Sequence, residues 1–190
     1  MKILLYFLVL MVTASIHVSA QETPLLEAYG GASILSSRGR GDVAAVERLQ
    51  TVGWHASITG NLRPWLSAVA DLAGQSKGLQ DIGFRDSSGR RYQFLFGPEL
   101  ALRSDRTKLF GHALLGTTQG NYIRDSGGYG FGNTKTDGLL MGFGGGLDLN
   151  VSRHIAARVI QFDWLPSRIG EVWSKNDLRF GYGVVIRGWR

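Results

Sequence analysis

The chain has 190 residues, including 27 glycines, four prolines and no cysteine, and a formal net charge of +6 at pH 7. This length leaves room for one ordinary domain, and the lack of cysteine excludes disulfide bonds, thiol chemistry and thiolate metal sites. The 21 basic residues are scattered singly and mostly lie near acids, which argues against a nucleic-acid-binding surface.

The first 20 residues have the three parts of a secretory signal peptide. Lys2 is the positive region, Ile3 to Ile16 is a nearly unbroken apolar stretch, and Val18 to Ala20 supplies the residues read by signal peptidase. An uncleaved membrane anchor is the alternative, but the apolar run is shorter than the ~20 residues that a spanning helix needs. We therefore predict cleavage after Ala20 and a mature domain of residues 21–190.

The mature region has the pattern of an all-β protein. Glycines lie inside apolar alternating segments, where they would weaken a helix, and helix-length periodicity is hard to find. Eight segments of about ten residues alternate with a period near two. In chain order they are Leu25–Leu35, Thr51–Gly60, Trp65–Gln75, Arg91–Leu102, Lys108–Gln119, Leu139–Asn150, Ile155–Leu165 and Leu178–Arg187.

The seventh segment breaks the alternation. Arg158 belongs to one face by parity, whereas Gln161 and Asp163 belong to the other. A β-bulge near Val159 and Ile160 would return all three to the polar face.

The links between segments alternate between short and long. Short polar links are expected at residues 61–64, 103–107 and 152–154, and longer links at residues 36–50, 76–90, 120–137 and 166–176. Tight turns at one end and longer loops at the other are typical of an outer-membrane barrel.

Alternation alone leaves open which face of the barrel is inside. The apolar faces carry large, almost uncharged side chains, and the polar faces carry charges of both signs, which favours lipid outside and ion pairs inside. The predicted lumenal charge network comprises Glu27, Asp71, Arg91, Glu99, Asp148, Arg158, Asp163, Arg179 and Arg187. The predicted interfacial aromatic girdles comprise Trp54, Trp65, Tyr92, Phe110, Trp164 and Trp189. A soluble lipocalin-like carrier, with its core inside, is the alternative.

The chain resembles the OmpA-like outer-membrane β-barrel domain family over nearly the whole mature region. The resemblance depends on short motifs at Gly53–Asn61, Phe94–Pro98, Gly144–Asp148, Arg158–Asp163 and Asn176–Arg179. It implies an eight-stranded antiparallel up-and-down transmembrane β-barrel in the outer membrane, with no particular biochemical activity and no cofactor. Its expected partners are outer-membrane lipid, lipopolysaccharide and the barrel-assembly machinery. The last strand departs from the family pattern, because Trp189 comes one position late and Arg190 follows it.

An enzyme is a competing interpretation. Lipid A deacylases are also eight-stranded barrels and use a His and a Ser two residues apart, which is the spacing of His55 and Ser57. Three observations argue against it: the pair falls on the predicted lumenal face, it lies early in the chain, and no carboxylate is obviously placed to orient the histidine.

Other candidate sites are weaker still. His112 and His55 lack a closely spaced metal-ligand partner, and the Gly-rich segment Asp125–Asn133 fits neither a phosphate loop nor a calcium loop. We predict that this segment is a mobile extracellular loop whose Tyr129 and Phe131 could touch a ligand. Cations in two predicted outer loops could contact lipopolysaccharide phosphates; they are Arg38, Arg40, Arg48, Lys77, Arg85 and Arg90.

The predicted role is structural, adhesive or weakly permeating, because eight strands enclose an interior that side chains fill. The alternative is a ligand- or surface-binding barrel that acts through its extracellular loops.

Overall fold

The computed structural model describes residues 23–38, 48–78, 90–125, 131–169, 172–175 and 177–188. The predicted signal peptide lies outside these residues. The strands are β1 (Leu26–Arg38), β2 (Arg48–Arg63), β3 (Leu66–Gly78), β4 (Arg90–Arg103), β5 (Thr107–Asp125), β6 (Phe131–Asn150), β7 (Ile155–Trp164), β8 (Ser167–Ile169), β9 (Val172–Ser174) and β10 (Leu178–Gly188). In this described part of the chain, no helix is long and apolar enough to cross a membrane.

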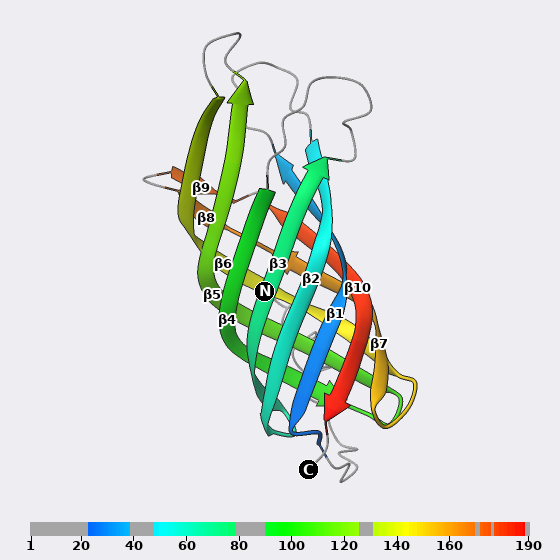
Figure 1. The fold of residues 1–190 in the computed structure, drawn as a ribbon. Helices are drawn as coiled ribbons and strands as arrows, with labels where there is room; N and C mark the ends of the chain where they lie inside the picture. Colours follow the sequence, from blue (N-terminus) through cyan, green and yellow to red (C-terminus); the bar gives the residue numbers. More distant parts are fainter. Residues whose placement is uncertain are drawn as a thin grey trace, which may run out of the picture.

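Eight long strands, β1 to β7 and β10, form a closed antiparallel barrel (Figure 1). Each pairs with its neighbours along the chain, and β1 closes the ring against β10, with Leu26 opposite Gly188 and Ser36 opposite Leu178. The predicted fold, an all-β eight-stranded antiparallel up-and-down barrel, is confirmed.

Short and long connections lie at opposite ends of the barrel (Figure 1). Tight turns join β2 to β3, β4 to β5 and β6 to β7, as predicted. At the other end the strands are longer than predicted: β5 and β6 have 19 and 20 residues and stay paired up to Asp125 opposite Phe131. Backbone pairing needs no side-chain alternation, so the ladder continues into the Gly-rich segment.

The prediction of an irregular loop over residues 120–137 is therefore wrong for most of its length. Asp125 ends β5 and residues 131–133 begin β6, while residues 126–130, with Tyr129, lie outside the described part of the chain. The link predicted at residues 166–176 also contains strands, because β8 and β9 form a small hairpin. β8 continues the pairing of β7 along β6, with Ser167 opposite Leu140.

The outward face of the barrel is apolar. On β4 the outward side chains are 48% to 57% exposed; they are Tyr92, Phe94, Phe96, Leu100 and Leu102. Outward positions carry no charged side chain from Val52 to Leu62 on β2 or from Phe180 to Ile186 on β10.

The predicted bulge in β7 is present. Leu147 lies opposite Ile160, but the next β6 residue, Asp148, lies opposite Arg158, so one extra β7 residue is accommodated there. Val159 and Ile160 are both exposed, whereas Arg158 and Gln161 on either side of them are both buried. The bulge thus keeps the polar side chains of β7 on one face.

Candidate functional site in the barrel interior

The barrel interior contains the predicted charged residues. Eight of the nine are buried, and Arg91 is partly buried. They do not form one continuous set of ion pairs; the structure divides them among a group around Glu27, a group around Arg179, a pair of Arg158 with Asp148, and a pair of Arg91 with Asp177 (Nη1–Oδ2, 2.9 Å).

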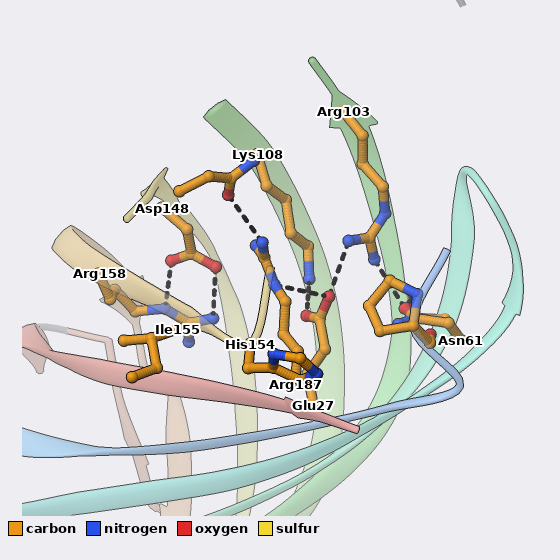
Figure 2. A network of polar contacts seen from close by, with 12 residues as sticks. Glu27, Asn61, Arg103, Lys108, Asp148, His154, Ile155, Arg158 and Arg187 are labelled. Carbon is orange, nitrogen blue, oxygen red and sulfur yellow. Dashed lines mark hydrogen bonds and ion pairs between the residues drawn. The ribbon is translucent and has the colours of Figure 1, made fainter. Parts of the chain in front are cut away.

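Glu27 is the centre of the group nearest the short turns (Figure 2). Its Oε1 accepts a hydrogen bond from Arg103 Nη1 at 2.7 Å, and its Oε2 accepts one from Lys108 Nζ at 2.6 Å. Arg187 Nε lies 3.6 Å from Glu27 Oε1, and Lys108 Nζ also lies 2.8 Å from Glu99 Oε1. This group therefore joins side chains from β1, β4, β5 and β10.

Arg179 is the centre of the second group and is fully buried. Its Nη2 donates to Asp71 Oδ1 at 3.0 Å, and its Nε donates to Asp163 Oδ2 at 2.9 Å. Each aspartate also contacts a histidine: Asp71 bonds His55 Nε2, and Asp163 Oδ1 lies 2.8 Å from His112 Nε2. The arginine thus crosses the interior between β3 and β7, and each carboxylate has a second partner.

Arg158 lies between the two groups. It makes two hydrogen bonds to Asp148, at 2.8 Å and 3.2 Å, and Gln161 connects it to Asp163. Its guanidinium lies 4.3 Å from the ring centroids of both Tyr29 and Phe110. These distances are within the range of a cation–π interaction on each ring.

The position of Phe110 corrects one prediction. Its side chain is only 4% exposed and points inward, so it does not belong to an outer aromatic girdle. The predicted segment that contains Phe110, Lys108–Gln119, has small residues on both faces, so its sequence does not determine which face points into the barrel. Of the other predicted girdle residues, Trp54, Trp65, Tyr92 and Trp164 lie on the outward face, and Trp189 is outside the described residues.

Glycines of β6 make room for these interior side chains. A Cβ added to Gly146 would lie 2.7 Å from the Phe110 ring, and one added to Gly144 would collide with the Asp163 carboxylate. Gly144 and Gly146, which lack side chains, therefore leave space for Asp163 and Phe110.

A layer of apolar side chains also lies inside the barrel, closer to the long connections. Its members are all buried; they are Leu35, Val69, Leu95, Leu114, Leu140 and Leu165. In the sequence, this layer corresponds to apolar residues at positions that alternation assigns to the polar face. Leu95, which lies between the outward residues Phe94 and Phe96, is an example. The interior thus contains the ion-pair groups around Glu27 and Arg179, this apolar layer, and the pair of Arg91 with Asp177 at strand ends next to the long connections.

The interior charges are balanced among the described residues. The ion pairs contain six acids and six permanently charged bases, besides the two histidines; they are Glu27, Asp71, Glu99, Asp148, Asp163 and Asp177 with Arg91, Arg103, Lys108, Arg158, Arg179 and Arg187. The sequence interpretation missed Arg103, Lys108 and Asp177. Lys108 and Arg103 lie at or next to the ends of predicted segments, where alternation assigns side chains to a face less clearly. Asp177 directly precedes the last strand.

His55 and Ser57 both lie inside the barrel, with exposed fractions of 1% and 6%. The expectation that no carboxylate orients His55 is wrong, because Asp71 from the adjacent β3 bonds its Nε2. The other ring nitrogen, Nδ1, has no hydrogen-bond partner, so the ring does not contact the Ser57 hydroxyl as a general base would.

The remaining candidates gain no structural support. Among the described residues, no group of three or more His, Cys, Asp or Glu side chains could hold a metal ion. Arg40 and Arg85 lie outside the described residues. The other four cations lie in strands at or near the ends that adjoin the long connections; they are Arg38, Arg48, Lys77 and Arg90.

Comparisons with solved structures agree with this architecture. Ail, the attachment invasion locus protein of Yersinia pestis, is 17% identical with a TM-score of 0.60, covering 85% of this chain and 97% of that chain. Neisserial surface protein A is 9% identical with a TM-score of 0.62, covering 85% and 96%. The N-terminal β-barrel domain of Pseudomonas aeruginosa OprF is 12% identical with a TM-score of 0.51, covering 86% and 97%.

These likenesses show the fold of a small outer-membrane-type barrel, as the resemblance in the sequence implied. No protein-family model and no curated protein matches the chain.

Proposed function

We propose that this chain is a structural or adhesive outer-membrane β-barrel, exported through a signal peptide cleaved after Ala20. The observation that carries the proposal is the distribution of polarity: large apolar side chains cover the outside, and paired charges fill the inside. A water-soluble barrel would bury its apolar face instead. In a bilayer, the outward apolar face contacts lipid and the strands satisfy their backbone groups within the closed ring.

The interior favours a structural role over a permanent pore. Ion pairs around Glu27 and Arg179 occupy one part of it, and the layer that includes Leu95 and Leu140 occupies another. Passage of a solute would require both to rearrange. The buried position of His55 and Ser57 argues in the same direction against a lipid-modifying hydrolase, since a lipid substrate would have to enter the barrel.

A second candidate is adhesion through the end with the long connections. β5 and β6 are far longer than the 9–11 residues a tilted strand needs to cross a bilayer, so their hairpin extends beyond the other strands (Figure 1). A structure of Ail has been determined in complex with the heparin analogue sucrose octasulfate. By analogy, the cations of the long connections are candidates for binding lipopolysaccharide phosphates or sulfated glycans.

Membrane fractionation of a Gram-negative host expressing the full chain tests the location. We expect recovery in the outer membrane and faster gel migration of the unboiled, folded protein. A matched pair of variants sharpens the test: Phe96→Arg, on the outward face, should lower the recovered folded fraction much more than Phe96→Leu. Recovery of wild type as a soluble periplasmic protein would contradict the proposal.

Adhesion is tested separately by replacing residues 124–132, which include the cation Arg124, with a two-residue Asn-Gly turn that joins the paired residues Ile123 and Asn133. Binding of the folded barrel to lipopolysaccharide-coated or heparin-coated surfaces is then compared with wild type. Loss of binding with unchanged heat modifiability would support an adhesive role for the hairpin end, whereas unchanged binding would exclude this hairpin tip as the adhesive element.

A further inference from the structure

Each short turn of the barrel carries an exposed arginine. Arg63 lies at the β2–β3 turn, Arg106 at the β4–β5 turn and Arg153 at the β6–β7 turn. Successive short turns are two strands apart in the closed ring, so the three arginines belong to three separate turns of the rim. We call this set the arginine rim.

Large apolar side chains lie directly beside the arginine rim. Leu62 precedes Arg63 and is 69% exposed, and Val151, two residues before Arg153, is 72% exposed. Trp65, in the first turn, is 54% exposed. Such side chains are costly to leave in water, and they continue the apolar outer face of the barrel to its very end. The turns therefore combine exposed apolar side chains with arginines close by in the sequence.

We propose that the arginine rim binds the phosphate groups of anionic phospholipids in the leaflet that surrounds the short-turn end. This inference builds on the membrane location proposed above. A guanidinium presents a planar set of donors that can pair with two phosphate oxygens at once, and its aliphatic stem can lie along Leu62 or Val151. Asp105, beside Arg106, is the acid exposed in the same turns, so positive charge predominates there.

The rim arginines differ from the basic residues of the interior. Arg103, three residues before Arg106, already bonds Glu27 and Asn61 inside the barrel. The rim side chains are instead exposed to solvent at the turns, where a phosphate group can reach them. Because each arginine lies in a different turn, each would contact a different lipid molecule.

Lipid preference can be measured by tryptophan quenching. The folded protein is placed in vesicles of phosphatidylcholine mixed with brominated phosphatidylglycerol, and separately with brominated phosphatidylcholine. We expect wild type to prefer phosphatidylglycerol up to about fivefold at low salt, the scale of one basic residue near an anionic surface, and to lose the preference at high salt. The triple variant R63Q/R106Q/R153Q should lose most of this preference.

Two further variants serve as controls. R63K/R106K/R153K keeps the charge and should retain most of the preference, while R168Q/K175Q removes charges at the opposite end and should match wild type. An R63Q/R106Q/R153Q protein that still prefers phosphatidylglycerol like wild type would overturn the inference. If wild type is not quenched by brominated phosphatidylcholine either, it does not insert, and the proposed membrane location fails instead.

Discussion

Arg179 shows how one residue organises the barrel interior. It is fully buried and bonds Asp163 from β7, the neighbour of β10, and Asp71 from β3, which is not a neighbour of β10. A buried ion pair is not necessarily more stable than a well-packed apolar pair, but a buried charge left without its partner is strongly destabilising. Two carboxylates depend on this one cation, so its removal should be among the most damaging single changes.

The change Arg179→Met tests this dependence. We expect a loss of about 3–5 kcal/mol in the free energy of unfolding, because Asp71 and Asp163 would lose the cation that balances their buried carboxylates. Urea unfolding in lipid vesicles, followed by gel migration without boiling, gives the measurement. Adding Asp71→Asn and Asp163→Asn to the variant should recover part of the loss, whereas exposed Lys175→Met should change stability by less than about 0.5 kcal/mol.

Phe110 supports a second prediction at this scale. Its ring and that of Tyr29 enclose the Arg158 guanidinium, each 4.3 Å away. Phe110→Leu should therefore cost about 2 kcal/mol, the magnitude of a desolvated cation–π contact. Phe96→Leu removes an outward ring of the same kind and should cost much less. Equal effects in the same unfolding assay would place Phe110 outside, as the sequence pattern had suggested.

The bulge in β7 is the most informative feature at the scale of single elements. Val159 and Ile160 both point outward between inward Arg158 and Gln161, so removing one of them restores strict alternation. We therefore expect a chain lacking Val159 to fold, with regular pairing to β6 and β10. Removing Phe162 should prevent folding, because Asp163 would then face lipid at a cost of up to about 2–4 kcal/mol besides losing Arg179. Heat modifiability of the two deletion variants distinguishes these outcomes.

The strands themselves were largely predictable from the sequence, because one face of each is uniformly apolar. Side-chain contacts between strands were not predictable in the same way. The bond between Asp71 and His55 depends on the register of β2 against β3, which no local sequence pattern specifies. The full length of β5 and β6 was also missed, since glycine and threonine weaken the alternation beyond Gly116. The three-residue strands β8 and β9 are too short to produce any periodic signal.

The interior of the whole molecule is divided into a charged part and an apolar part. The pair of Arg91 with Asp177 lies at strand ends next to the long connections. The apolar layer lies between the Glu27 group and the long connections and is built by side chains from six strands or their ends, among them Leu35, Leu95 and Leu140. Ions lose hydration in passing such a constriction, which makes it an effective barrier even where the rest of a pore is polar.

We therefore expect wild type to show no stable conductance in planar bilayers. Truncating the layer with Leu95→Ala and Leu140→Ala should admit water and produce brief openings. The outward pair Leu100→Ala and Leu139→Ala removes the same volume without touching the layer and should remain silent. Steady conductance of the wild type would contradict a barrel closed by its own side chains.

The seam between β1 and β10 has a consequence for how the barrel forms. Every other pair of neighbouring ring strands consists of long strands that are consecutive in the chain. The seam instead joins the first strand to the last, with residue 26 opposite residue 188, so it cannot form until the last strand has been made. Contacts between distant residues carry a large loop-closure entropy and slow folding. Seam closure is thus the natural slow step of assembly, and the contact of Glu27 on β1 with Arg187 on β10 can form only at that step.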